Sequence, residues 1–347
     1  MNTSGRSTII LLDANVWIKE RLLRSAIGVA VLYSLGRSGI KMALPNVIRR
    51  EAIAGILKAG RKAASDVENG LSTLQAITRS KPAIKLPSED DLLAAAEKRF
   101  AELQHHLIEI DHSPEQMARA LDRVIAGRSP SARKEQFRDA LLWECALEIS
   151  SKHDVLFVTR DDDFVDAKPG TLASGLEKEL SDGSRKLTLF ADAADVLAAI
   201  TDRVPPLNYD YVANLILEAV NYELHLLEEK HGIIIGGLTW QNLAAFATEE
   251  VDTLAVSFRI NLGTVFPGTL NAPETVDGVV IVAGECFYNT RTDEVLDVNL
   301  DRIQIHSPTG EPKGAVYLQA NMGGESRAIP YKVRHPIDGA RRSTETS

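Results

Sequence analysis

Cysteine is scarce in this sequence: the 347 residues include 2, Cys145 and Cys286. Two distant cysteines exclude a disulfide framework, and they also exclude a cysteine-based zinc site, which needs clustered ligands. The 8 histidines form no pair at the spacing of a metal site. A reducing compartment suits such a chain, so we expect a cytoplasmic protein.

Long hydrophobic runs are absent as well. No stretch approaches the roughly 20 apolar residues that a helix needs to cross a bilayer. The first residues, MNTSGRST, lack the basic and apolar regions of a signal peptide. We therefore expect neither a membrane protein nor a secreted one. Hydrophobic residues make up 44% and charged residues 25%, as in ordinary globular proteins, and a length of 347 residues favours two domains.

The net charge of −9 is distributed unevenly along the chain. The first 200 residues hold 28 basic and 28 acidic side chains, so the remaining 11 basic and 20 acidic side chains carry the whole net charge. A surface that acidic repels the phosphate backbone of nucleic acids. If the protein binds a nucleic acid, the first part of the chain is therefore the better candidate.

Short apolar segments alternate with helical segments over the first part of the chain. The predicted strands are 8–12, 40–44, 155–159 and 187–190, and the longest predicted helices are 46–78, 89–106 and 135–150. The first strand, TIILL, is apolar without alternation, which is typical of a strand buried on both faces of a parallel sheet. We therefore predict an α/β domain with three layers and a mainly parallel sheet at residues 1–203.

The pattern changes after the segment DRVPP at 202–206. A helix is predicted at about 209–230, and the strands 251–261, 276–288, 295–305 and 315–320 follow with partial alternation. These elements indicate a smaller, acidic α+β domain with an antiparallel sheet at residues 207–337. The polar tail 338–347 is predicted to be disordered.

Several acidic residues stand where a parallel sheet would gather them. Asp13 ends the first strand, and Asp161 and Asp163 follow the strand 155–159. Open α/β sheets place their sites at the carboxyl ends of the strands, so these residues should share one edge. Glu51 in the helix after the second strand and Asp139 near the start of helix 135–150 should lie near the same edge.

Such a cluster of carboxylates needs a counter-charge, because like charges in one site raise each other's pKa. A divalent cation supplies it, and ligation by oxygen alone favours Mg²⁺ or Mn²⁺ over Zn²⁺. One or two such ions can activate a water and neutralise charge that develops on a phosphate. The acids therefore predict a metal-dependent phosphodiesterase.

The motifs around these acids resemble those of PIN domains. They are the strings LLDANVW at 11–17, RE at 50–51, RDALL at 138–142 and TRDDDF at 159–164, in the order D…E…D…T-x-D-x-D-F. The likeness covers about the first 200 residues and is greatest to a larger PIN-like subgroup in bacteria. It implies a nuclease, commonly an endoribonuclease, that uses metal-activated water, with a possible role as a toxin or defence effector.

The resemblance also assigns roles to residues. Asp13, Glu51, Asp139 and Asp161 take the positions of the metal ligands. Asp163 supports the site as a further catalytic residue, Thr159 fixes the turn, and Asn15 orients the first aspartate. The chain departs from the family in a long insertion at about 60–133 between the second and third acids.

Basic residues precede the third acid. Arg133, Lys134 and Arg138 are candidates for contacts with the phosphates of RNA or DNA, and an ordinary solvated helix face is the alternative. Domain 207–337 carries no chemical motif, and its acidity suggests a regulatory partner or self-association.

Each acid also has an ordinary structural interpretation as a helix cap, a surface residue or a partner of the helix dipole. Phosphatases of the haloacid-dehalogenase type need a second aspartate where this chain has Asn15, and Toprim-type sites need a glutamate in a glycine-rich turn. Neither class explains Asp139. The remaining alternative is a degenerate PIN-like scaffold that binds protein or RNA without catalysis.

Overall fold

The computed structural model describes residues 6–80, 83–132, 135–165, 171–181, 185–201, 204, 207–266, 276–306 and 312–316. The chain divides into two compact units, Met1–Pro206 with Ala244–Ser257 and Leu207–Leu243 with Phe258–Ser347. The predicted tail 338–347 lies outside the described residues, as does the part of the last predicted strand beyond residue 316. Within the described ranges, no helix is both long enough and apolar enough to cross a membrane.

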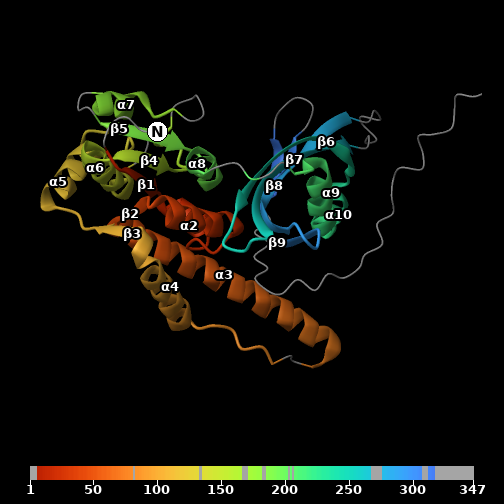
Figure 1. The fold of residues 1–347 in the computed structure, drawn as a ribbon. Coiled ribbons are helices and arrows are strands. Elements are labelled where there is room, and N and C mark those ends of the chain that lie inside the picture. The colour runs from red at the N-terminus through yellow and green to blue at the C-terminus, as the bar shows by residue number, and fades with distance from the viewer. Residues whose placement is uncertain are drawn as a thin grey trace, which may run out of the picture. The chain divides into compact units, whose positions relative to one another are not determined.

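The first unit is built on a parallel sheet of five strands in the order β3-β2-β1-β4-β5 (Figure 1). The strands are β1 (Thr8–Leu12), β2 (Lys41–Pro45), β3 (Leu107–Ile110), β4 (Asp154–Val158) and β5 (Lys186–Phe190). Every neighbouring pair is parallel. The predicted mainly parallel sheet is confirmed, and TIILL is its buried central strand.

Helices cover both faces of this sheet. They are α1 (Ala14–Lys19), α2 (Ala26–Ser38), α3 (Asn46–Thr78), α4 (Glu89–Leu103), η1 (Gln104–His106), α5 (Pro114–Ile125), α6 (Phe137–Lys152), α7 (Ser174–Ser181) and α8 (Ala193–Ile200). Connections between parallel strands are right-handed. The connection from β1 to β2 therefore places α2 on one face of the sheet. The connections into β4 and β5 run the other way along the sheet, so they place α6 and α7 on the other face. Helix α8 packs against α2, and α5 packs against α6 (Figure 1).

Strand β1 lies between β2 and β4, so the order of the strands reverses at its carboxyl end. Open α/β sheets place their ligand sites at such a switch point. Large aromatic side chains fill the core on either side of the strand: Trp17 packs against Phe100 with ring centroids 5.4 Å apart, and Trp143 packs against Phe164 at 6.4 Å. Both tryptophans are fully buried, so they serve the core of the domain.

The insertion that separates the second and third acids contains more of the domain than the sequence indicates. Strand β3 was not predicted, because LIEI is short, polar in part and only half buried at the edge of the sheet. Helices α3 and α4 form a hairpin in which Gly60 faces Leu92 and Arg61 pairs with Glu89 at 3.7 Å. The insertion therefore adds a helical arm, an edge strand and α5.

The second unit combines two helices with an antiparallel meander. Its elements are α9 (Tyr209–Ala219), α10 (Asn221–His231), β6 (Ile234–Ala247), β7 (Thr253–Phe266), β8 (Val276–Asn289), β9 (Glu294–His306) and β10 (Pro312–Val316). The end of β6 and the start of β7, within residues 244–257, are grouped with the first unit. The strands follow one another in the sheet, and β9 pairs antiparallel with β8 and β10. The predicted fold class is confirmed, although the predicted single helix is two, with a break at Val220, and β6 was not predicted.

Asp192 joins three elements of the first unit. It caps the N-terminus of α8, accepts a hydrogen bond from the backbone of Ala194 at 3.2 Å, and pairs with Lys19 at 3.1 Å and with Arg160. Burial by itself would raise the pKa of this carboxyl, but the two cations outweigh that effect and lower its pKa to about 2.

We expect the substitution Asp192→Asn to lower the free energy of unfolding by about 2 kcal/mol at neutral pH. A carboxyl whose pKa is lower in the folded than in the unfolded state stabilises the fold above the unfolded pKa, near 3.8, and loses that contribution as the pH falls toward 2. Urea unfolding of both proteins should therefore show a difference that shrinks below about pH 4. A difference that stays constant on acidification would contradict this assignment.

Candidate metal centre

Asp13 is fixed at the carboxyl end of β1 by a dense set of hydrogen bonds. Its backbone N–H donates to the carbonyl of Val158 at 2.9 Å, which extends the pairing of β1 with β4. Its carboxylate caps α1 and accepts hydrogen bonds from the N–H of Ala14 at 2.6 Å and from the side-chain amide of Asn15 at 2.8 Å. The side chain therefore has one orientation, toward the switch point of the sheet.

Thr159 links this aspartate to the turn after β4. Its hydroxyl donates to Oδ2 of Asp13 at 2.6 Å and accepts a hydrogen bond from the backbone N–H of Asp161 at 3.0 Å. The carboxylate of Asp161 in turn accepts the N–H of Asp163 at 2.9 Å. The threonine thus sets the position of Asp161 relative to Asp13, and its own contacts give it a positioning role.

Asp163 is engaged by a residue that the sequence analysis missed. The side-chain amide of Gln136, which precedes α6, donates a hydrogen bond to its carboxylate. This bond connects the turn after β4 to the start of the helix that carries Asp139. Gln136 gives no signal in the sequence, because the contact exists only once the turn after β4 and the start of α6 are packed together.

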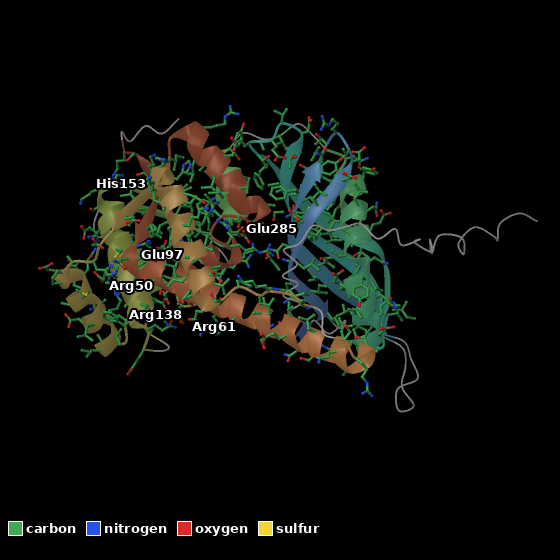
Figure 2. All side chains as sticks on the ribbon, turned by 90° about the horizontal axis from the view of Figure 1, so that it is seen from below. Arg50, Arg61, Glu97, Arg138, His153 and Glu285 are labelled. Carbon is green, nitrogen blue, oxygen red and sulfur yellow. The ribbon has the colours of Figure 1, made fainter. Side chains whose placement is uncertain are left out.

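Glu51 approaches the site from α3 and meets a cation there. Its carboxylate pairs with Arg138, whose side chain remains 69% exposed while that of Glu51 is 21% exposed. Arg138 lies at the start of α6, next to Asp139, and Arg50 lies on α3 (Figure 2). The predicted phosphate contact is therefore also the counter-ion of one of the predicted ligands.

Burial and repulsion between neighbouring carboxyl groups raise the pKa values of three of the four acids. Burial raises the pKa of Asp139 to about 7, with further contributions from Asp161, Asp13 and Glu51. Burial also raises the pKa of Asp13 to about 6, against its hydrogen bonds from Thr159 and Ala14 and with the help of Asp161 and Glu51. The pKa of Glu51 is raised in the same way, although Arg138 opposes the shift.

This donor set fits a hard divalent cation. Its ligands are carboxylate oxygens, and their mutual repulsion is what a divalent cation would relieve. The side-chain oxygen of Asn15, beside Asp13, is buried and has no hydrogen-bond partner among the described residues. As the side chains stand, the described part of the chain holds no group of three or more His, Cys, Asp or Glu residues close enough to bind an ion.

The remaining basic residues near the third acid do not add to the site. Arg133 and Lys134 lie outside the described residues. Arg119 and Arg123 on α5 both pair with Glu144, at 2.7 Å each. Glu144 follows Asp139 on α6 by five residues. Glu144 is thus a structural partner of these arginines.

Residues 10–164 match the family model of the PIN domain, a range that includes all five predicted catalytic acids. This part of the chain is therefore PIN-like, with a nuclease-like fold. A search of curated proteins finds no match to this chain.

Proposed function

We propose that this protein is a divalent-metal-dependent nuclease that cleaves RNA endonucleolytically, with Asp13, Glu51, Asp139 and Asp161 as the metal ligands. The observation that carries the proposal is that burial and the mutual repulsion of these carboxyl groups, at the carboxyl edge of the sheet, raise the pKa of Asp13 to about 6 and that of Asp139 to about 7. Carboxylates held together at such a cost are typical of functional sites. The preference for RNA over DNA rests on the family resemblance.

Bound Mg²⁺ or Mn²⁺ would neutralise the acid cluster, activate water and stabilise the charge that develops on the phosphate during hydrolysis. The residues of the chain prepare the site for this. Thr159 and Asn15 hold Asp13 in place, and Gln136 holds Asp163 beside the start of α6. Arg138, mostly exposed beside Glu51, is the side chain that would bind a substrate phosphate.

A labelled single-stranded RNA and the DNA of the same sequence, each incubated with Mn²⁺, Mg²⁺ or EDTA, test this function directly. We expect internal cleavage of the RNA with either metal and none with EDTA. Absence of cleavage by well-folded protein that also fails to bind Mn²⁺ in calorimetry would refute it. Preferred cleavage of the DNA would retain the nuclease and change its substrate.

A second candidate is a PIN-like scaffold that binds RNA or protein without cleaving it. The ion pair between Arg138 and Glu51 favours it, because it compensates one ligand without a metal. The same experiment separates the two, since a scaffold would bind RNA with no dependence on metal. A toxin or defence role is a separate proposal, which expression of the wild type and of Asp13→Asn in a bacterial host tests through growth arrest by the wild type alone. The two buried free cysteines suit a cytoplasmic setting for either role.

We expect Arg138→Gln to tighten the binding of Mn²⁺ by about 3–10-fold, because it frees Glu51 from its counter-ion. It should weaken RNA binding at the same time, since it removes the phosphate contact. Calorimetric titration with Mn²⁺ measures the first effect without relying on activity. Arg50→Gln is the matched control. It removes the same charge from the residue that precedes Glu51, whereas the ion pair of Glu51 in the described residues is with Arg138. Equal affinities of the two variants for Mn²⁺ would contradict the prediction.

A further inference from the structure

Helix α5 presents an apolar stripe to the solvent. Met117, Leu121 and Ile125 are 41%, 51% and 75% exposed. They follow one another at intervals of four residues, so they lie on one face of the helix. A stripe of large apolar side chains on a charged helix is a feature that marks interaction surfaces.

The opposite, polar face of α5 is the buried one. Gln116 and Arg123 are 2% and 3% exposed, and Ala120 between them is fully buried. Gln116 donates to Glu148 on α6 at 2.9 Å, while Arg123 pairs with Glu144 and with Glu179 at 2.7 Å each. Rotating the helix to bury its apolar stripe would expose or break these paired charges, at a cost of several kcal/mol. The orientation of α5 is therefore fixed with its apolar side outward.

We propose that this stripe is the interface of a homodimer, in which α5 packs antiparallel against α5 of a second copy with Leu121 on the two-fold axis. A two-fold interface brings the same patch of both copies together, so the patch must be complementary to itself. Met117 and Ile125 are equally far from Leu121 along the helix. In this arrangement each Met117 therefore meets Ile125 of the second copy, and the row of i, i+4 side chains interlocks with itself.

The charges that flank the stripe select the antiparallel arrangement and the second copy as occupant. Glu115 stands in the first turn of α5, and Arg128 follows its C-terminus. Antiparallel pairing about Leu121 brings Glu115 of each copy level with Arg128 of the other. It also opposes the two helix dipoles. Parallel packing would place like charges together at both ends.

A pair of helices of this length buries less than the ~800 Å² per partner that is common in stable complexes. We therefore expect a dimer that depends on concentration, with a dissociation constant in the micromolar range. Sedimentation velocity of the full-length protein across that range should show a monomer–dimer equilibrium. A wild type that remains a monomer throughout the range would overturn the proposal.

The substitution Leu121→Glu places a charge at the centre of the proposed interface. It should raise the dissociation constant about tenfold or more, while circular dichroism and thermal unfolding stay close to wild type because the site is exposed. Leu74→Glu on α3 is the matched control, since Leu74 is 50% exposed against 51% for Leu121. It should leave the equilibrium unchanged. A dimer that persists in Leu121→Glu, or one that Leu74→Glu dissociates equally, would overturn the proposal.

Charge reversal tests the antiparallel register. Glu115→Arg alone and Arg128→Glu alone should each weaken the dimer, because each brings like charges together. The double variant Glu115→Arg/Arg128→Glu should restore the dissociation constant to within about threefold of wild type. A double variant that is no stronger than the single variants would overturn the register. The measurement does not depend on nuclease activity, so it stands apart from the function proposed above.

Discussion

Asp139→Asn should abolish metal-dependent cleavage and stabilise the fold at the same time. Removal of one ligand from the carboxylate cluster should lower the rate of cleavage by about 10²–10³-fold or more. The same substitution removes a charge whose pKa the cluster and its burial raise to about 7. Because this side chain is partly exposed, we discount the electrostatic gain and expect the free energy of unfolding at neutral pH to rise by about 1 kcal/mol.

Asp162→Asn is the matched control for this prediction. Asp162 belongs to the same acidic turn but is exposed, so its substitution should change neither the rate of cleavage nor the stability. Cleavage assays and urea unfolding in EDTA measure the two effects separately. Full metal-dependent cleavage by Asp139→Asn would remove this residue from the proposed site, and a loss of stability would contradict the repulsion that we infer.

Asp13→Asn should separate the two effects. It should lose cleavage as Asp139→Asn does, but without gaining stability. The carboxylate of Asp13 accepts hydrogen bonds from Ala14, Asn15 and Thr159 on its two oxygens, and an amide offers one accepting oxygen in their place. The repulsion that is relieved is therefore offset by hydrogen bonds that are broken.

Arg123→Met should produce the largest loss of stability, about 3–5 kcal/mol, because it removes the buried cation that lies between two carboxylates. The side chain of Arg123 is 3% exposed and pairs with Glu144, itself 5% exposed, and with Glu179. The indole of Trp143 also donates to Glu179, at 3.0 Å, so the network reaches the core. For a domain of this size, the loss corresponds to a melting temperature about 10 °C lower.

Arg119→Met provides the comparison within the same helix. Arg119 pairs with the same glutamate at the same distance of 2.7 Å, but its side chain is 52% exposed. An exposed ion pair contributes about 0–1 kcal/mol, so this variant should unfold close to wild type. Equal losses of stability in the two variants would show that burial does not decide the strength of this network.

The parts of the molecule that the sequence predicts share a simple physical cause. A strand buried on both faces must be apolar throughout, so TIILL identifies β1 without further information. Parallel strands end at one edge, which is why Asp13 and Asp161 could be expected to meet. The predicted contact of Thr159 with the turn follows from the same local geometry, because its partners are two residues away or on the adjacent strand.

The elements that the sequence did not predict depend on their surroundings. Strand β3 is held by its pairing with β2, since its own side chains are too polar and too few to identify it. Strand β6 contains a pair of glycines, Gly236 and Gly237, that interrupt its apolar pattern, and its pairing in the sheet overrides this weakness. The partner of Asp163, Gln136, is 27 residues away in the sequence and becomes a neighbour only in the folded domain.

Helix α5 shows most clearly how the two levels divide. The sequence by itself determines that α5 is amphipathic, and the usual inference would bury its apolar side. The tertiary structure decides the reverse, because α6 and α7 offer Glu144, Glu148 and Glu179 to this helix, and paired charges must be buried together. In the same way, the identity of the acids and their order along the chain follow from the sequence alone. The pairing of Glu51 with Arg138 was decided by the packing of α3 against α6, because a charge takes the partner that the fold brings nearest.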